Sequence, residues 1–287
     1  MLRKLRRRYS KHLPPRARRI AQRVAREVDI ITGWPASRSR RGAVAVLHVG
    51  RSGSTVLGNM LDEHPEVVWD GECFYVQHHA SPDAIRGHKA GTWLHRQMNA
   101  SGSKYYGFEF KPLPDQHLSF VDLSLDEVLS AFSAAGVSHY IILKRRNALR
   151  RMISQYVGAA TGIRHLSTGQ SIKKKKVRID VESAGFGDVW TPKPLLTCLE
   201  EIEDLYQTLE RRLANEKCLI LEYESDIGKD GPQVAFRRTC EFLGLPSMDV
   251  SPSLVRTNPY AVAELLENYE DVASALRGTK FEWMLEG

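Results

Sequence analysis

Residues 48–57, HVGRSGSTVL, join an apolar run to a helical pattern, and this junction decides the fold class. The run before it, 43–47, holds small and branched apolar residues that favour a buried strand. After it, apolar residues recur with helical spacing over 56–61. A strand that turns through small residues into a helix presents backbone N–H groups and the positive end of the helix dipole. The stretch therefore predicts an anion-binding loop.

This loop differs from the phosphate loop of ATP- and GTP-binding proteins, G-x-x-x-x-G-K-[ST]. No lysine follows Gly53, and Gly50 lies only three residues before it. The cation of the loop is Arg51, which lies inside the turn. We therefore expect a phosphate-like ligand other than the metal-bound β,γ end of a nucleoside triphosphate.

Short apolar runs alternate with helical patterns along the rest of the chain. Strands are expected at 43–48, 67–70, 105–110, 139–144 and 218–222, and helices at 54–63, 126–135, 148–161, 194–216 and 232–243. Several strands lack polar alternation, which is typical of a parallel sheet covered on both faces. The sequence thus predicts an α/β fold with a central parallel β-sheet flanked by helices. The length of 287 residues allows one large domain or two small ones.

The net charge of +7 is unevenly distributed. Residues 1–41 hold 14 basic and two acidic residues, a net charge of +12, whereas the rest holds 27 basic and 32 acidic residues, a net charge of −5. Apolar residues recur in the basic segment with a spacing that predicts an amphipathic helix over 15–31. This extension is compatible with a solvated, poorly ordered segment or with adhesion to an anionic membrane surface. Nucleic acid is the less favoured partner.

Cysteine usage and hydropathy bear on the compartment. The four cysteines lack any C-x-x-C or zinc spacing, so we expect reduced thiols in a reducing compartment. No apolar run reaches about 18 residues, and the basic N-terminus lacks the apolar part of a secretory signal. These features favour a cytoplasmic protein, peripheral at the inner membrane face if the extension binds lipid.

A second candidate region is the segment 141–154, IILKRRNALRRMIS. Its apolar strand ends in Arg145 and Arg146, and a helix carries the Ser154 hydroxyl two turns along. The planar fork of arginine matches two phosphate oxygens, and doubly wound sheets bind ligands beyond the carboxyl ends of their strands. We expect these residues to face the first loop. Acids are absent around this helix start while cations crowd its positive end, which argues against a merely structural role.

A third candidate is Glu72, which follows Gly71 at the end of the strand expected at 67–70. A lone glutamate at a strand end is commonly a surface or capping residue. Next to a cationic phosphate loop it becomes a candidate general base. Lys111 and His117, after the third strand, are secondary candidates that would meet the acceptor or support the base; a solvated surface loop is the alternative.

Together these segments resemble the sulfotransferases that use 3′-phosphoadenosine-5′-phosphosulfate (PAPS). Arg51-Ser52-Gly53-Ser54-Thr55 resembles their 5′-phosphosulfate loop, in the R-S-G-[ST]-[ST] form of the carbohydrate and protein-tyrosine branches. Gly71-Glu72 is similar to the Gly-Glu whose carboxylate acts as base in the tyrosine branch. Arg146 with Ser154 fits the R-x-x-x-x-x-x-x-S motif for the 3′-phosphate, whereas an R-x-N variant would use Arg145.

Further segments follow in the family's order, and the resemblance spans about residues 43 to 284. Residues 61–65 resemble L-x-x-H-P, and 221–224 with 242–246 resemble "L-x-Y-E…F-L-G-L-P". Residues 268–270 and 276–279 resemble the family's C-terminal tail. Two features differ from the cytosolic branch: Arg51 stands where that branch has a catalytic lysine, and its catalytic histidine has no secure counterpart.

The resemblance implies a single domain over 42–287, related to P-loop nucleotide kinases, and metal-free sulfuryl transfer from PAPS to an acceptor hydroxyl. Arg51 and the loop N–H groups would stabilise the departing 5′-phosphate, and Glu72 would accept the hydroxyl proton. Arg145 or Arg146, with Ser154, would hold the 3′-phosphate. A carbohydrate or lipid-linked sugar is the acceptor expected first. The alternatives are an NTP-dependent phosphotransferase of the P-loop kinase type and a non-enzymatic nucleotide-fold adaptor that acts through its basic extension.

Overall fold

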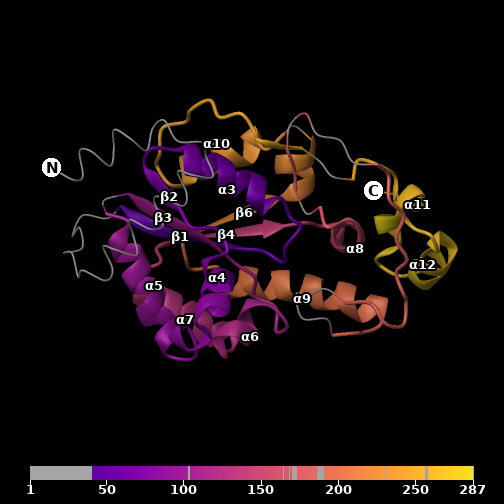
Figure 1. Ribbon diagram of the computed structural model, residues 1–287, viewed down its shortest axis with the longest axis horizontal. Helices are drawn as coiled ribbons and strands as arrows, with labels where there is room; N and C mark the ends of the chain where they lie inside the picture. The colour runs from indigo at the N-terminus through magenta and orange to yellow at the C-terminus, as the bar shows by residue number, and fades with distance from the viewer. Residues whose placement is uncertain are drawn as a thin grey trace.

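The computed structural model describes residues 41–286, apart from 103, 164, 168, 170–172, 186–190, 230, 256 and 257. Its centre is a five-stranded, all-parallel sheet with the order β2-β3-β1-β4-β6 (Figure 1). The strands are β1 (Gly42–Leu47), β2 (Val67–Trp69), β3 (Tyr105–Phe110), β4 (His139–Lys144) and β6 (Cys218–Glu222). The predicted α/β fold with a central parallel sheet in a single domain is confirmed. The helix expected over 15–31 lies outside the described residues.

β1 is apolar throughout because it is buried on both faces. It pairs with β3 on one side and with β4 on the other. Ala43, Ala45 and Leu47 pack into the core on one face of the sheet, and Val44 and Val46 pack into the core on the other. A central parallel strand therefore needs a continuous apolar run rather than polar alternation.

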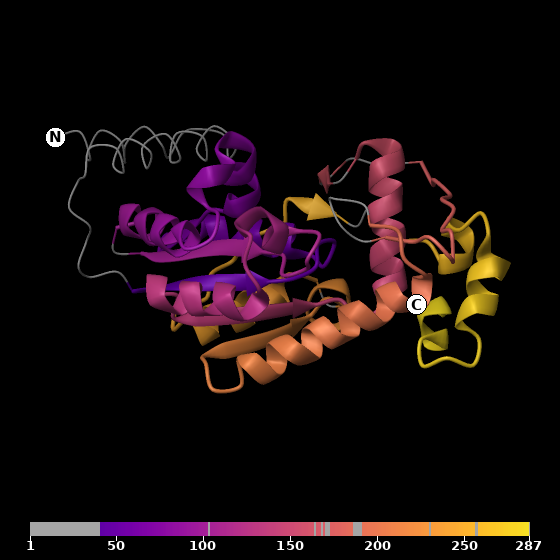
Figure 2. The ribbon, with the colours of Figure 1, turned by 90° about the horizontal axis from the view of Figure 1, so that it is seen from below.

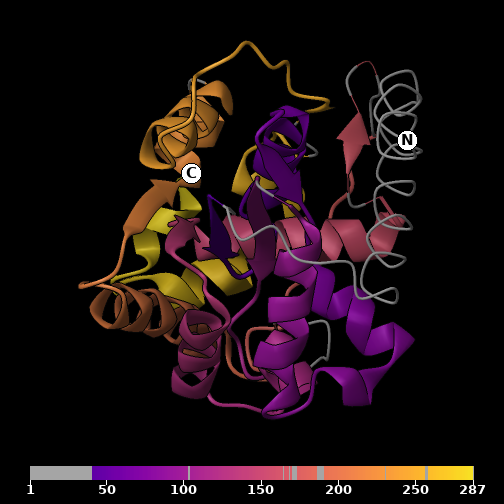
Figure 3. The same cartoon turned by 90° about the vertical axis from the view of Figure 1, so that its left-hand side faces the viewer.

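Helices cover the two faces of the sheet unequally (Figure 3). On one face lie α3 (Ser54–Glu63) and α10 (Gln233–Phe242). On the other lie α4 (Cys73–Ala80), α5 (Lys89–Ala100), α6 (His117–Val121), α7 (Leu125–Ala135) and α9 (Leu195–Arg212). The expected helix at 194–216 is thus confirmed with a shorter C-terminal end.

The remaining elements lie largely beyond the carboxyl ends of the strands, where Figure 2 shows α8 and the C-terminal helices. They are α8 (Ala148–Thr161), α11 (Val262–Leu265), α12 (Tyr269–Leu276) and the short pair β5 (Leu166–Ser167) and β7 (Leu254–Val255). Single turns complete the described chain: η1 (Pro82–Ala84), η3 (Glu282–Leu285) and the π-helix η2 (Tyr223–Lys229). These elements lie beside the edge of the sheet that carries the three candidate regions, namely the loop 48–57, the segment 141–154 and Glu72.

The four cysteines are all free thiols, as expected. Burial raises the pKa of the Cys198, Cys218 and Cys240 thiols to about 11, so these groups are protonated and unreactive at neutral pH. Within the described part of the chain, no helix has the length and apolar character needed to cross a bilayer.

Trp69 joins the edge strand β2 to its neighbours because two glycines leave room for its indole ring. A Cβ atom on Gly58 of α3 would lie 2.4 Å from Trp69 Nε1, and one on Gly107 of β3 would lie 2.5 Å from Trp69 Cε3. Both distances are shorter than any real carbon contact. The two glycines are therefore required by close approach rather than by backbone conformation.

Gly58→Ala tests this packing. Alanine favours a helix by about 1 kcal/mol over glycine, but overpacking typically costs about 1–3 kcal/mol, so we expect a net loss of unfolding free energy. Urea denaturation measures the change. In a Trp69→Leu background the same substitution is expected to be neutral or stabilising, and an equal loss in both backgrounds would contradict the packing explanation.

Candidate active site

The loop after β1 has the strand–turn–helix form predicted from the sequence. Gly50, Arg51 and Gly53 have φ angles of 77°, 52° and 88°, so the chain enters the left-handed region three times within four residues. Arg51 carries a side chain in this region, a conformation that is strained and concentrated at functional sites. The N-cap of α3 is Gly53, so no side chain caps the helix, and no acidic residue lies in its first turn. The loop thus presents the positive end of α3 at the edge of the sheet.

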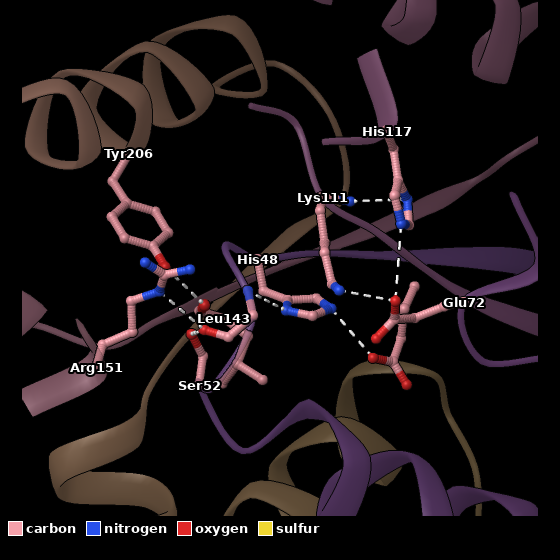
Figure 4. A network of polar contacts seen from close by, with 10 residues as sticks. His48, Ser52, Glu72, Lys111, His117, Leu143, Arg151 and Tyr206 are labelled. Carbon is pink, nitrogen blue, oxygen red and sulfur yellow. Dashed lines mark hydrogen bonds and ion pairs between the residues drawn. The ribbon is translucent and has the colours of Figure 1, made fainter. Parts of the chain in front are cut away.

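Two other arginines bind the carbonyl oxygens of this loop. Arg151 donates from Nη2 to Val49 O at 2.6 Å and from Nε to Gly50 O at 3.3 Å. Arg145 donates from Nη1 to Arg51 O at 2.8 Å. Arg151 is fully buried, and Figure 4 shows it beside Ser52 and Tyr206. Sequence reasoning did not single out Arg151, since only its burial distinguishes it from the neighbouring arginines.

Arg51 and Ser154 are brought into direct contact. Arg51 Nε donates to Ser154 Oγ at 3.1 Å, although 103 residues separate them. Ser52 is buried and donates from Oγ to Gly50 O at 3.1 Å, which closes the turn from within. Ser54 begins α3 and is buried, whereas Thr55, next along the helix, is partly exposed. The loop and the helix α8 therefore lie against each other and form one side of the candidate site.

Glu72, Lys111 and His117 form the other side (Figure 4). Lys111 Nζ lies 2.8 Å from Glu72 Oε2, and His117 Nε2 lies 3.7 Å from the same oxygen. The backbone N–H of Lys111 donates to His117 Nδ1 at 3.2 Å. This hydrogen bond places the proton of a neutral His117 on Nε2, the nitrogen that faces Glu72. The two secondary candidates therefore surround the candidate base rather than forming a solvated loop.

Lys111 also connects this cluster to the loop. A Cβ atom on Gly50 would lie 3.7 Å from Lys111 Cε, so the lysine side chain passes alongside Gly50 before its ammonium reaches Glu72. The side chain of Lys111 is 11 % exposed, whereas that of Glu72 is 33 % exposed. The carboxylate is thus the more accessible member of the pair.

Behind the loop lies a buried pair that sequence reasoning missed. The N–H of Gly50 donates to His48 Nδ1 at 2.9 Å, and His48 Nε2 lies 3.1 Å from Glu109 Oε2. Both side chains are 5 % exposed or less. Their signal in the sequence was a polar residue at the end of each of two otherwise apolar strands, β1 and β3.

The ionisation of the Glu72 cluster follows from these contacts. Burial alone would raise the pKa of Glu72, but the His117 ring and the Lys111 ammonium outweigh it and hold that pKa well below its ordinary range. Burial lowers the pKa of His117, despite the nearby carboxylate. At neutral pH the cluster therefore holds an ionised Glu72 beside a neutral imidazole.

Arg145 and Arg146 have different surroundings. The guanidinium of Arg145 stacks over the ring of Tyr223, 4.3 Å from its centroid, while it donates to the loop carbonyl of Arg51. Arg146 Nε lies 3.3 Å from Glu222 Oε2, and its side chain is 55 % exposed. Arg145 is therefore committed to supporting the loop, whereas Arg146 faces outward.

The first turn of α8 holds no acidic residue, as the sequence showed, but an acid from another segment reaches it. Glu224, from the π-helix after β6, accepts the N–H groups of Arg146 and Asn147 at 3.0 Å each. Asn147 Oδ1 accepts the N–H of Arg150 at 2.8 Å and completes the cap. The acid comes from a segment 77 residues away, so local sequence could not show it. The start of α8 is consequently satisfied by the protein itself, and the side chain of Arg146 just before it faces outward.

The acid dependence of stability tests the Glu72 cluster. Because the folded pKa of Glu72 is lowered, the unfolded chain takes up this proton first as pH falls, so the stability that Glu72 contributes is present at neutral pH and declines below about pH 5. We expect the difference in unfolding free energy between wild type and Glu72→Gln to shrink between about pH 5 and pH 3. Chemical denaturation at each pH measures it. Glu66→Gln, which removes an exposed partner of Arg41, is the control. A difference that is constant with pH would contradict the assignment.

Comparison with known proteins assigns no family to this chain. Neither protein-family models nor curated proteins give a significant match to the chain. The functional proposal therefore depends on the positions and charges of the residues at the edge of the sheet.

Proposed function

We propose that this protein is a PAPS-dependent sulfotransferase that transfers a sulfuryl group to an acceptor hydroxyl, with a carbohydrate or lipid-linked sugar as the first acceptor class to test. The observation that carries the proposal is the meeting of the Arg51 loop with the Lys111–Glu72 pair beside Gly50. A loop suited to anions, a lysine ammonium and an ionised carboxylate are thus adjacent. These are the groups that sulfuryl transfer to a hydroxyl needs.

The loop supplies the donor end of the proposed site. Backbone N–H groups, the start of α3 and Arg51 would bind the 5′-phosphosulfate. A transferred sulfuryl group carries less charge than a γ-phosphoryl group, so such donors can stabilise the negative charge that develops on the departing phosphate. The S–O bond to the phosphate breaks as the S–O bond to the acceptor forms. The leaving group is adenosine 3′,5′-bisphosphate.

Glu72 would accept the proton of the attacking hydroxyl. In the resting protein its pKa is too low for an efficient base, because Lys111 and His117 stabilise the carboxylate. Lys111 lies between Glu72 and the loop, so a sulfuryl group bound at the loop would compete for its ammonium. As charge develops on the sulfuryl oxygens, the ion pair between Lys111 and Glu72 would weaken, and the pKa of Glu72 would rise. Lys111 thus couples donor binding to base strength.

Arg146 is the residue we assign to the 3′-phosphate. Arg145 already binds a loop carbonyl and stacks on Tyr223. Arg146 is exposed, and a phosphate could replace Glu222 in its partly exposed ion pair. Arg146 is also the residue that fits the spacing to Ser154 in the motif that the sequence resembles.

The packing of other resembling segments supports the proposal. His64 Nε2 lies 3.0 Å from Pro246 O, which joins the segment 61–65 to the segment 242–246. Asn147 Nδ2 donates to Met284 O at 2.9 Å, which ties the C-terminal turn to the start of α8. Tyr223 and Glu224 support Arg145 and the cap of α8. The C-terminal turn and the segment after β6 thus meet at the arginine end of the site, whereas the His64 contact joins two segments at the far end of α3.

Transfer of label from radioactive PAPS to a carbohydrate or lipid extract tests the function directly. We expect labelled product in buffer containing EDTA. Turnover of ATP that requires Mg²⁺ would instead favour a phosphotransferase. Ligand binding that survives Arg51→Ala but disappears on removal of residues 1–41 would favour an adaptor.

Glu72→Gln separates catalysis from binding. We expect it to lower the transfer rate by at least about 100-fold, the usual minimum effect of a positioned base, while adenosine 3′,5′-bisphosphate binds within about threefold of wild type because the amide keeps the shape of the side chain. Single-turnover kinetics and calorimetry measure the two quantities. Near-normal turnover would remove Glu72 from the base role.

Arg146→Ala tests the 3′-phosphate assignment. We expect affinity for adenosine 3′,5′-bisphosphate to fall by about tenfold or more, the effect of losing a charge-assisted contact, while affinity for adenosine 5′-phosphosulfate, which lacks the 3′-phosphate, is retained. Arg145→Ala is the matched comparison and should weaken both ligands, since it disturbs the loop. An equal loss of both ligands in Arg146→Ala would exclude it from binding the 3′-phosphate.

A further inference from the structure

Arg151 is a buried cation whose contacts are directed at the backbone of the loop. It is 1 % exposed and binds the consecutive carbonyls of Val49 and Gly50. Burial lowers its pKa to about 10, so it is charged at neutral pH. Burying a guanidinium is expensive, and an apolar side chain of similar volume would often stabilise the fold as well. The energetic cost points to a role in what the loop binds.

Peptide geometry shows what these hydrogen bonds do. In a trans peptide the C=O and the N–H point in opposite directions. The peptide between Val49 and Gly50 illustrates this, because its oxygen accepts from Arg151 and its N–H donates to His48 on the other side. In the next peptide, Gly50 O is held by Arg151, which turns the Arg51 N–H away from that guanidinium.

The following peptide is held in the same way by the second arginine. Arg51 O accepts from Arg145, so the Ser52 N–H points away from it. Arg151 and Arg145 therefore hold three successive carbonyl oxygens. The N–H of Gly50 in the first peptide is bound by His48, and the N–H groups of Arg51 and Ser52 in the next two point away from the guanidinium groups. Loop carbonyls turned toward an anion would repel it, whereas N–H groups turned toward it bind it.

We propose that Arg151 is the positioning residue of the anion loop: it anchors the loop through Val49 O and holds the carbonyl of Gly50 inward, so that the N–H of Arg51 faces the donor. The identity of that donor rests on the proposed function, but the orientation of the loop does not. Arg151 also places a positive charge directly behind the bound anion, where the low dielectric of the interior strengthens its effect. It acts through the loop and does not itself contact the substrate.

Arg150 offers a matched control on the same helix. It is the preceding residue, and its Nη2 donates to Tyr260 O at 2.7 Å, a carbonyl outside the loop. Arg150→Met and Arg151→Met each remove a guanidinium that binds a backbone carbonyl. Only Arg151→Met should affect anion binding.

Calorimetry with adenosine 3′,5′-bisphosphate and with inorganic pyrophosphate tests the proposal on the full chain. We expect Arg151→Met to weaken both ligands by about tenfold or more, since small misplacements of binding groups have effects of this size, and Arg150→Met to bind them within about twofold of wild type. Arg151→Lys restores the charge but lacks the fork that spans two carbonyls, so it should recover part of the affinity. Thermal unfolding of each variant shows whether it is folded.

Two results would overturn the proposal. One is wild-type affinity in a folded Arg151→Met or Arg151→Lys protein. The other is a loss of affinity that follows thermal stability equally in the Arg150 and Arg151 variants. If pyrophosphate binding depends on Arg151 but the wild-type protein transfers no label from PAPS, the loop role is supported and sulfuryl transfer is refuted. The two proposals can therefore fail separately.

Discussion

The hydrogen bonds from buried arginine to the carbonyl oxygens of residues 49 and 50 are the contacts on which the candidate site depends. They fix the direction of the peptides in a loop that enters the left-handed region three times. The same loop starts α3 and carries Arg51 to Ser154, so its orientation also sets the first helix against α8. A change in these peptides would alter the anion-binding N–H groups, the strained Arg51 and the contact with α8 together.

The parallel sheet accounts for the rest of the site. Parallel strands all end at the same edge, so loops from β1, β2, β3 and β4 meet there although they are far apart in the sequence. This brings the arginines after β1 and β4 opposite the carboxylate after β2. Lys111, after β3, lies between these two sides because β3 lies between β2 and β1 in the sheet. The strand order thus places Lys111 between the loop after β1 and the carboxylate after β2.

The sheet could be predicted from sequence because its central strands β1, β3 and β4 are buried almost throughout and so appear as largely apolar runs. The helices α3 and α8 were predicted with the ends that the structure shows, because their apolar residues recur with helical spacing. The helix α4 was missed because half of its residues, in CFYVQHHA, face partly into solvent and leave no clear period. Glu224 and Arg151 could not be assigned, since their roles depend on contacts made over 77 and 102 residues and on burial.

Two carboxylates lie near Lys111 and the loop, and their surroundings give them different roles. Glu109 is 4 % exposed and faces His48, whose other nitrogen accepts the N–H of Gly50. The pair is buried and binds the loop backbone, so it is suited to holding the loop. Glu72 is one-third exposed and contacts a lysine that also reaches the loop. Environments that separate two nearby carboxylates in this way are how active sites divide structural and proton-transfer tasks. Under the proposed function, the accessible carboxylate is therefore the one that takes the proton, and the buried one belongs to the framework that holds the loop.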